Sequence, residues 1–541
     1  MIHISIPSTR TQTEPDDPFN KYTVYDIHVN GAFHASVRYN LLYTLHEKLV
    51  ETFGHRLEAP EFPPKKIWKL DNKSLNERRE ALSKYLQGVI SSPDVARHAI
   101  IENAFLEFQV RSFSASISRV VKLEILLPDG RPVYIECCAD DSTNCVMLKL
   151  CRAIVMNERN IRYFGLFLAH QRPELCDNEN ESTSNSSSTR FNMLFMNERN
   201  IRYFGLFLAH QRPELCDNGN ESTSNSSSTR FNMLCVRWLK NFESPFISQQ
   251  LLNPSKDQQF QHKILIRRVS WDPSLEEPLL DDPGSLKVLY LQALNDIQKG
   301  LLQVPSDVKT KLTSLQEFGE FKQFVRLCHL QVGYGYEWLA PVLAELTPKG
   351  EMTLCELKVG RRQLLLEYKD VEDNETIRTC KLLSKRIRVW RVSHLDNPLQ
   401  QNNQQLNNTS MMTFQLEYLI RRDEFSVFTL EMESTHAVLL SLFLQSIADE
   451  ILRSREGSTS PPYKFDDCIS IRAAESLEAS KANSILSDQL SIKSASGSSV
   501  SNGIEGEIMQ NGYGNFVIKL ISYQMPFMEN ESFEDVGDED L

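Results

Sequence analysis

The sequence lacks the short motifs that carry catalytic or phosphate-loop chemistry. No G-x-x-x-x-G-K-[ST] loop, no kinase-type His-Arg-Asp triplet, no H-E-x-x-H and no G-x-S-x-G occurs in its 541 residues. Its 11 cysteines include no Cys-x-x-Cys pair and no zinc-spaced group, which is typical of reduced thiols in the cytosol. We therefore expect a protein that is not an enzyme and that uses no cofactor and no metal.

Long hydrophobic runs and excess positive charge are also missing. The longest apolar run, HAVLLSLFL, is much shorter than the ~20 residues that a membrane span needs. A net charge of −12 argues against nucleic-acid binding through bulk charge, although a local basic patch is still possible. The chain is too long for one ordinary core, so we expect several domains.

A hairpin and two helices are predicted near the N-terminus. Residues 22–37 alternate between apolar and polar on both sides of Asn30-Gly31, which is a strong hairpin signal. Leucines then recur at helical spacing over residues 41–49, and again over residues 75–86 after a Pro-rich loop at 57–70.

Basic residues follow the strand, the loop and the start of the second helix. Arg38 ends the strand beside Tyr39, Lys65 follows two prolines, and Arg78 lies in the helix. Phosphate oxygens favour charge-assisted donors, and a guanidinium offers two of them in one fork. Each residue alone is typical of a solvated face, but in this order they predict one anion-binding pocket.

A 40-residue segment occurs twice. Residues 156–195 recur as 196–235, and the copies differ only at Glu179/Gly219 and Phe195/Cys235. Repeat architectures keep a core pattern while their surfaces diverge, and they need at least three copies. Near-identity therefore favours a recent duplication or a gene-model artefact over a structural repeat. We expect one YFGLFL to pair in a sheet, the other to be looped out, and deletion of 196–235 to be neutral or stabilising.

The rest of the chain divides into four regions, which makes the predicted fold class multidomain α+β. Residues 118–272 open with strand, strand, helix, strand, as in a ubiquitin-like fold, and residues 273–345 show helical periodicity. Residues 346–455 contain several strands closed by one helix, the layout of a phosphotyrosine-binding or pleckstrin-like module. Residues 456–541 are Ser-rich, so we expect a disordered tail, and they end in GDEDL.

Residues 1–112 resemble a phox-homology (PX) domain, a three-stranded sheet with helices. The resemblance rests on VRYNLL, FPPKKIW and NERREALSKYL. This family binds phosphatidylinositol 3-phosphate on endosomal membranes. The resemblance implies that Arg38 holds the 3-phosphate and that Tyr39 packs against the inositol ring. It also implies that Lys65 contacts the 1-phosphate side and that Arg78 binds the ring hydroxyls.

The same resemblance implies a membrane-inserting loop. Ile67 and Trp68 occupy the positions that family members press into the bilayer, and a tryptophan between lysines suits the membrane interface. The alternative is that Trp68 is a packed loop anchor, because large aromatic side chains tend to be buried.

The downstream order of ubiquitin-like, helical and phosphotyrosine-binding-like regions resembles a FERM module. PX followed by FERM is the architecture of a small sorting-nexin subfamily, which IHVNG, FPPKK, WRV and the terminal GDEDL also resemble. Residues 517–530 do not fit this resemblance, and a gene-model insertion is one interpretation of them. The resemblance implies a cytoplasmic cargo adaptor that is peripheral on early endosome membranes.

Two further sites are implied by the subfamily. Receptor tails with Asn-Pro-x-Tyr or Asn-x-x-Tyr add as a strand in the last FERM lobe, which places Trp390 on the neighbouring strand. Ala448 and Leu452 would lie on the helix that forms the other wall. For all three residues, burial in an ordinary core is the alternative.

The C-terminal residues Asp538, Glu539, Asp540 and Leu541 match the end that the subfamily uses to recruit the recycling complex Retriever. A terminal leucine with a free carboxylate fits a basic groove with an apolar pocket. Most acidic tails are simply solvated, which is the alternative.

A signalling scaffold is the competing hypothesis for the whole chain. In that reading the ubiquitin-like lobe binds a small GTPase through basic residues such as Arg267 and Arg268. Ordinary surface charge is the alternative explanation of these two arginines.

Overall fold

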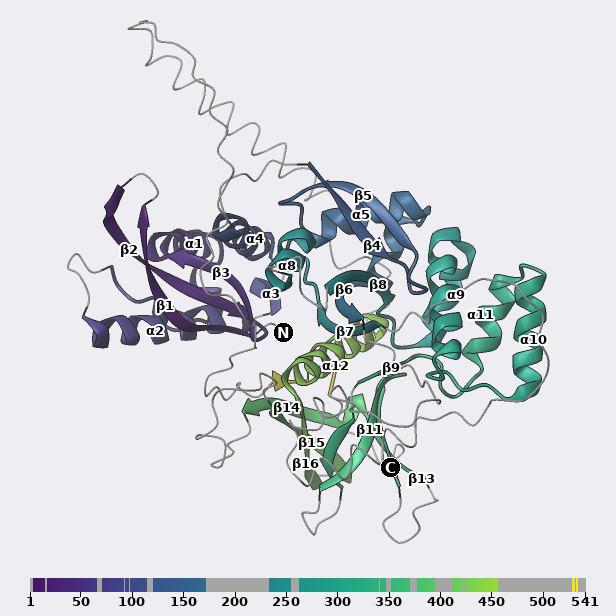
Figure 1. The fold of residues 1–541 in the computed structure, drawn as a ribbon. Helices are drawn as coiled ribbons and strands as arrows, with labels where there is room; N and C mark the ends of the chain where they lie inside the picture. Colours follow the sequence, from purple (N-terminus) through teal and green to yellow (C-terminus); the bar gives the residue numbers. More distant parts are fainter. Residues whose placement is uncertain are drawn as a thin grey trace, which may run out of the picture.

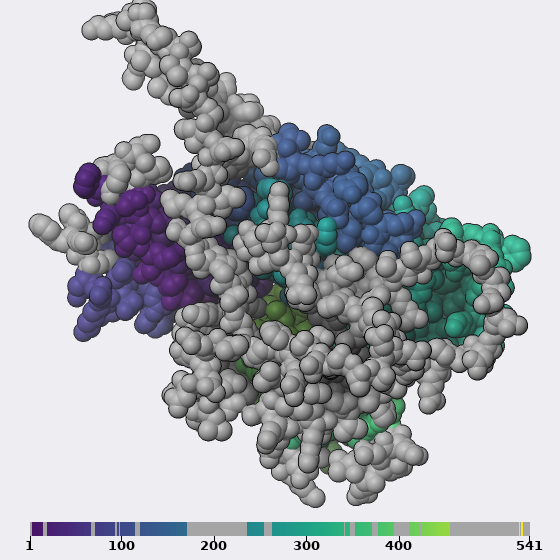
Figure 2. Space-filling model, viewed as in Figure 1, coloured from purple at the N-terminus to yellow at the C-terminus, as the bar shows by residue number. Residues whose placement is uncertain are grey.

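The computed structural model describes most of the chain before residue 456 and a short segment near the C-terminus. Four units follow one another, and Figure 1 shows the N-terminal unit (purple) and the helical lobe (teal) on opposite sides, with the C-terminal lobe (green) below the ubiquitin-like lobe (blue). Figure 2 shows the same separation of the purple and teal surfaces. The described residues are 3–14, 17–65, 71–91, 93–96, 98–113, 120–171, 233–253, 262–339, 341–346, 352–369, 377–394, 411–421, 424–455, 528–530 and 532–533.

The N-terminal unit contains the predicted hairpin. Strands β2 (Asp17–Val29) and β3 (Ala32–Arg38) pair antiparallel, and Asn30 and Gly31 both have positive φ, at 51° and 78°. Two central residues with positive φ are the mark of the type I′ turn, which Asn-Gly favours. An additional strand that the sequence did not predict, β1 (Ile4–Glu14), pairs with β2 and completes a three-stranded sheet.

Helices cover this sheet and form one core with it. Helix α1 buries Leu42, Leu45 and Leu49, so the buried stripe begins one residue later than the predicted Leu41. The helices of this unit are α1 (Tyr39–Phe53), the 3₁₀ turn η1 (Gly54–Arg56), α2 (Asn72–Ser91), α3 (Pro93–Ala96) and α4 (Ala99–Phe113).

The ubiquitin-like lobe has a five-stranded sheet in the order β5-β4-β8-β6-β7. The predicted closing strand, β8, lies at its centre and runs parallel to β4. Ser142 begins helix α5 as its N-cap by accepting a hydrogen bond from Cys145 N. The elements are β4 (Val120–Leu126), β5 (Pro132–Cys138), α5 (Thr143–Ile154), η2 (Glu158–Tyr163), β6 (Phe164–Gln171), β7 (Met233–Trp238), α8 (Pro245–Leu252) and β8 (His262–Arg268).

The two copies of the duplicated segment contribute different strands. The first copy supplies β6, which pairs with β8, and the end of the second copy begins β7, which pairs with β6. The second YFGLFL, residues 203–208, lies outside the described residues. Cys235, one of the two positions that differ, is partly buried in β7 against the core of the C-terminal lobe.

Deletion of residues 195–234 should leave the melting temperature unchanged. This deletion joins Leu194 to Cys235 and regenerates the β7 sequence MLCVRW, because Met193-Leu194 repeats Met233-Leu234. Thermal unfolding of the full chain and the deletion variant checks this.

Deletion of residues 196–235 is the matched control. It places Phe195 where Cys235 packs, and an oversized side chain in a packed site costs about 1–3 kcal/mol. The melting temperature should therefore fall in this variant alone. This differs from the neutral effect expected from the sequence, because Cys235 belongs to a folded strand. Equal falls in both variants would show that the second copy has a structural role.

The helical lobe shares a core with the ubiquitin-like lobe. Val288 and Leu289 of α9, together with Phe324 of α11, are buried in the same cluster as Ile125 and Ile264 of the neighbouring sheet. The elements are η3 (Pro273–Asp281), α9 (Pro283–Gln298), α10 (Ser306–Glu317) and α11 (Phe321–His329).

The C-terminal lobe is a nine-stranded sheet closed by one long helix, α12. By length and composition α12 could cross a membrane, but Leu440, Phe443 and Ile447 are buried in the core of the lobe. Its elements are β9 (Tyr336–Trp338), β10 (Val342–Glu345), β11 (Met352–Gly360), β12 (Gln363–Lys369), β13 (Ile377–Leu383), η4 (Ser384–Arg386), β14 (Ile387–His394), β15 (Met411–Arg421), β16 (Glu424–Glu433), α12 (Ser434–Arg455) and β17 (Met528–Glu529).

Strand β17 comes from the region that the sequence predicts to be a disordered tail. It pairs antiparallel with β14, and a turn through Asn530, Ser532 and Phe533 follows it. For these residues the prediction of disorder is wrong, because β14 supplies the backbone partners that the segment cannot supply for itself. Of the segment 517–530, Met528 to Asn530 have a place in the fold, and the other residues lie outside the described residues.

The N-terminal unit is fixed to the ubiquitin-like lobe through buried polar contacts. Gln109 of α4 accepts a hydrogen bond from Ser244 N at 2.7 Å and donates one to Ser248 Oγ at 3.0 Å. Phe242 packs into the core of the N-terminal unit beside His34 and Phe105. These contacts set the position of the N-terminal unit relative to the lobes.

Candidate functional site

Arg38 is the last residue of β3, and α1 begins directly after it. Its guanidinium carbon is 3.3 Å from the centre of the Tyr22 ring on the neighbouring strand β2, a cation–π contact that holds the side chain against the sheet. Arg38 is also the N-cap residue of α1, but its side chain makes no cap hydrogen bond, and the first turn contains no acidic residue. Arg38 therefore lies at the positive end of the helix dipole.

Tyr39 and Arg78 meet at the Pro-rich loop. The Tyr39 hydroxyl donates to Pro63 O at 2.7 Å, and Arg78 Nη2 donates to Pro64 O at 3.1 Å. The Arg78 guanidinium lies over the Tyr39 ring, 4.7 Å from its centre. The exposed Lys65 follows Pro64 directly in this loop.

The structure thus brings the predicted residues Arg38, Tyr39, Lys65 and Arg78 to one end of the N-terminal unit, which we call the basic site. Burial raises the pKa of Tyr39, and Arg78 partly offsets the rise. Sequence analysis missed Tyr22, whose only sequence signal is its place on the strand paired with β3. The predicted membrane residues Ile67 and Trp68 lie outside the described residues.

A second site lies along β14, between that strand, η4 and α12, and we call it the peptide site. Strand β17 occupies it, with Met528 opposite Trp390 and Glu529 opposite Val389. The Met528 side chain is buried in the core of the lobe, and its sulfur lies 3.8 Å from Ser441 Oγ of α12. The peptide site therefore binds an extended segment by backbone pairing and buries one of its side chains.

Asn530 fixes the end of this segment. Its side-chain amide donates to Ser384 O at 2.9 Å and to Ile387 O at 2.6 Å, and its backbone N–H donates to Arg388 O at 2.9 Å. Asn530 O accepts from Phe533 N at 2.9 Å, which closes a turn. The bound segment is thus a strand followed by a turn with the pattern Asn-x-x-Phe.

Ser532 and Phe533 complete the turn. Ser532 is fully buried, and its N–H and Oγ–H both donate to Asn530 Oδ1, at 3.1 and 2.8 Å. The Phe533 ring lies 6.2 Å from that of Phe425, over which the Arg388 guanidinium also packs. Sequence analysis missed these residues, although an Asn three positions before an aromatic residue was a readable signal.

Trp390 lies on the predicted strand, but its side chain is part of the core. It is buried, and its Nε1 donates to Ser441 Oγ at 2.9 Å, so its backbone faces the bound segment while its indole supports α12. Ala448 is buried and Leu452 is half-buried, two and three turns beyond Ser441 on the same face of α12. Ser441 is the helix residue that touches Met528, and it was not predicted.

Arg267 and Arg268 are not surface residues. Both are buried; Arg267 pairs with Glu337 at 2.6 Å, and Arg268 pairs with Glu276 at 3.5 Å. These pairs join the ubiquitin-like lobe to the helical and C-terminal lobes. The two arginines therefore offer no binding surface, and the scaffold hypothesis loses the residues that supported it.

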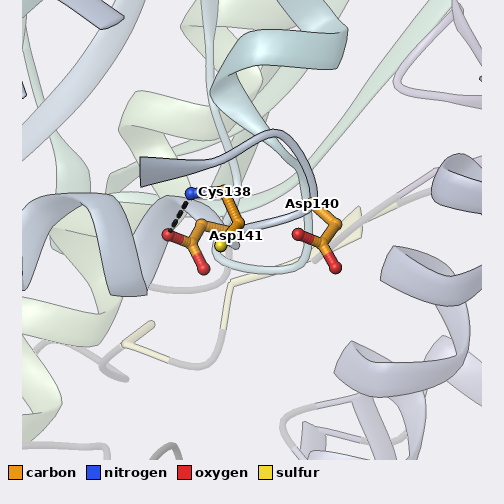
Figure 3. A group of neighbouring side chains, drawn as sticks. All are labelled: Cys138, Asp140 and Asp141. Atoms are coloured by element: carbon orange, nitrogen blue, oxygen red, sulfur yellow. Dashed lines mark hydrogen bonds between the residues drawn. The ribbon is translucent and has the colours of Figure 1, made fainter. Parts of the chain in front are cut away.

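One group of candidate metal ligands lies at the end of β5. Figure 3 shows Cys138, Asp140 and Asp141, whose ligand atoms lie within 4.8 Å of one another. The Asp141 carboxylate accepts from Cys138 N at 2.9 Å and pairs with Lys149 at 2.6 Å. These bonds stabilise the turn between β5 and α5, and this structural role accounts for the position of the Asp141 carboxylate. The remaining predicted site residues, Asp538, Glu539, Asp540 and Leu541, lie outside the described residues.

Comparisons with known protein families match four parts of the chain. A PX domain matches residues 25–109, and the F1 lobe of the sorting nexin 17/27/31 FERM domain matches 121–183 and 178–271. The F2 lobe of the sorting nexin 17/31 FERM domain matches 272–330, and the sorting nexin 17 FERM C-terminal domain matches 335–452. The basic site lies within the first match and the β14 strand of the peptide site within the last.

Three sorting nexins align with most of this chain. Sorting nexin-17 of Danio rerio is 27% identical over 559 aligned residues, covering 100% of both chains. Sorting nexin-17 of Homo sapiens is 26% identical and covers 85% of this chain and 83% of its own. Sorting nexin-31 of Mus musculus is 24% identical, covering 76% and 79%. The chain belongs to the PX-FERM sorting nexins and is similar to sorting nexin-17.

Proposed function

We propose that this protein is a non-enzymatic cargo adaptor of early endosomes. The basic site binds phosphatidylinositol 3-phosphate, the peptide site binds Asn-Pro-x-Tyr or Asn-x-x-Tyr motifs of receptor tails, and the C-terminus recruits Retriever to return cargo to the cell surface. The observation that carries the proposal is the turn of Asn530, which places an Asn-x-x-aromatic motif in the peptide site.

The geometry of the peptide site supports the proposed cargo class. Backbone pairing with β14 suits many sequences, whereas the two carbonyl oxygens of Ser384 and Ile387 require a side chain with two N–H donors. Asparagine supplies them at the first position of a turn. A receptor tail with Asn-Pro-x-Tyr carries the same amide and an aromatic ring three residues later.

The chemistry of the basic site supports the proposed binding of phosphatidylinositol 3-phosphate. Arg38 supplies a fork of donors at the N-terminus of α1, and both features favour a phosphate group. Tyr39 and Arg78 offer a ring face and further donors beside it. Lipid binding and cargo binding on one membrane then reinforce each other by avidity.

The tail joins cargo binding to recruitment of Retriever. The segment in the peptide site, which ends at Phe533, and the motif from Asp538 to Leu541 lie within the last 14 residues of the sequence. A receptor tail that takes the peptide site has to displace this segment. We therefore propose that bound cargo makes the C-terminus available to Retriever.

A synthetic receptor-tail peptide with Asn-Pro-x-Tyr should bind the full chain, and the same peptide with Ala for Asn should bind about thirtyfold more weakly. The Ala peptide loses two hydrogen bonds to carbonyl oxygens, each worth ~1 kcal/mol. Isothermal titration calorimetry measures both constants. Equal affinities would exclude the Asn-specific site as the place where cargo binds.

A further inference from the structure

Ser532 combines full burial in the bound segment with acidic neighbours in the sequence, and docking of the segment does not require the second of these. It is fully buried in the bound segment, and its hydroxyl donates to Asn530 Oδ1 at 2.8 Å. In the sequence it is followed by Phe533, Glu534 and Asp535, after Glu529 and Glu531 on its other side. A hydroxyl amid acidic residues is therefore closed to solvent when the segment is bound and open to it when the segment leaves.

We propose that Ser532 is a phosphorylation site for an acid-directed serine kinase, and that its phosphate keeps the tail out of the peptide site. The kinase transfers the γ-phosphoryl group of ATP. A P–O bond forms to Ser532 Oγ, the bond between the γ-phosphorus and the β,γ-bridging oxygen breaks, ADP leaves, and the hydroxyl proton passes to the kinase base. Only the released tail is a substrate, because bound Ser532 is buried.

The contacts of the turn explain why the phosphate prevents rebinding. A phosphoserine carries a charge of about −1.5 to −2 and no proton on the ester oxygen, so the bond to Asn530 Oδ1 is lost. The charge would have to enter a site in which Ser532 has no exposed surface. Burying an ion without a partner is far more costly than burying a hydroxyl.

The guanidinium of Arg388, whose backbone oxygen accepts from Asn530 N, is already paired with a carboxylate. Arg388 forms three charge-assisted hydrogen bonds to Glu417, at 2.6, 2.7 and 3.1 Å, and packs over Phe425. A phosphate would have to break the Arg388–Glu417 pair to gain the Arg388 guanidinium. Modification of the released tail thus holds it in the released state, in which the peptide site is open.

Binding of tail peptides in trans tests the effect of the phosphate. The protein is the full chain with Asn530→Ala and Phe533→Ala, whose own tail leaves the site open. The probes are fluorescent peptides of residues 520–537, either unmodified, phosphorylated at Ser532, or phosphorylated at Ser522 as a charge-matched control. We expect the Ser532 phosphopeptide to bind at least about tenfold more weakly than the other two. Equal or tighter binding of that phosphopeptide would overturn the proposal, as would an unmodified peptide that does not bind.

Mass spectrometry of the full chain isolated from cells tests the modification itself. Phosphate on Ser532 should be present, and its occupancy should be higher in Asn530→Ala than in the unaltered chain. An unmodified Ser532 in both proteins would refute the proposal. The inference rests on the proposed function in one respect: the open peptide site is taken to be the place where receptor cargo binds. Neither experiment uses receptor cargo, so failure of the cargo titration would leave both results standing.

Discussion

Replacement of Arg38 with alanine should reduce binding to vesicles that contain phosphatidylinositol 3-phosphate by about a hundredfold or more. The guanidinium provides charge-assisted hydrogen bonds to a phosphate, each worth ~1.5–3 kcal/mol, and alanine provides none. The Tyr22 ring, whose centre lies 3.3 Å from the guanidinium carbon, holds the Arg38 side chain in place, so this side chain is already ordered before the lipid arrives. Arg38→Lys should retain only part of the binding, because lysine keeps the charge but lacks the fork.

Arg56→Ala is the matched control for this substitution. Arg56 is exposed and follows the far end of α1, whose 15 residues span about 22 Å. The control removes the same charge from the same unit, so it should reproduce any effect of bulk electrostatics. Vesicle flotation with and without the lipid measures all the variants. Equal losses in Arg38→Ala and Arg56→Ala would contradict a specific pocket.

The basic site could be predicted because its residues lie at the ends of elements with strong local signals. Asn30-Gly31 determines the hairpin, the hairpin determines where β3 ends, and Arg38 is the last residue of β3. The carbonyl oxygens of Pro63 and Pro64, which bind Tyr39 and Arg78, depend on the path of a loop. No residue pattern in the sequence specified these carbonyls, and the ring of Tyr22 was missed for the same reason.

The peptide site was predicted on the correct strand but with incomplete contacts. The alternation of RIRVWRVS indicated β14, whereas the short β17 has too few residues for a periodic pattern. Its strand conformation arises from pairing with β14, across a sequence separation of more than 130 residues. Burial of Arg267 and Arg268 was missed in the same way, because Glu337 and Glu276 come from other lobes.

Release of the tail should raise the affinity of the full chain for a receptor-tail peptide by about tenfold. The chain's own segment competes from within the molecule, and a tethered competitor has an effective concentration on the order of 1 mM. A segment with an intrinsic dissociation constant on the order of 0.1 mM would then lower the apparent affinity of cargo about tenfold. Asn530→Ala with Phe533→Ala removes the bonds to Ser384 and Ile387 and the ring beside Phe425, so the peptide site opens.

Phe516→Ala is the control for this double substitution, because it removes an aromatic residue from the tail at a position 17 residues before Phe533. It should leave the affinity for cargo unchanged. Calorimetry with one Asn-Pro-x-Tyr peptide compares the three proteins. The double variant should also bind Retriever without cargo, since the segment that begins at Met528 is no longer held beside β14. A double variant with unaltered cargo affinity would mean that the bound segment does not compete, and that receptor tails bind at another place on the molecule.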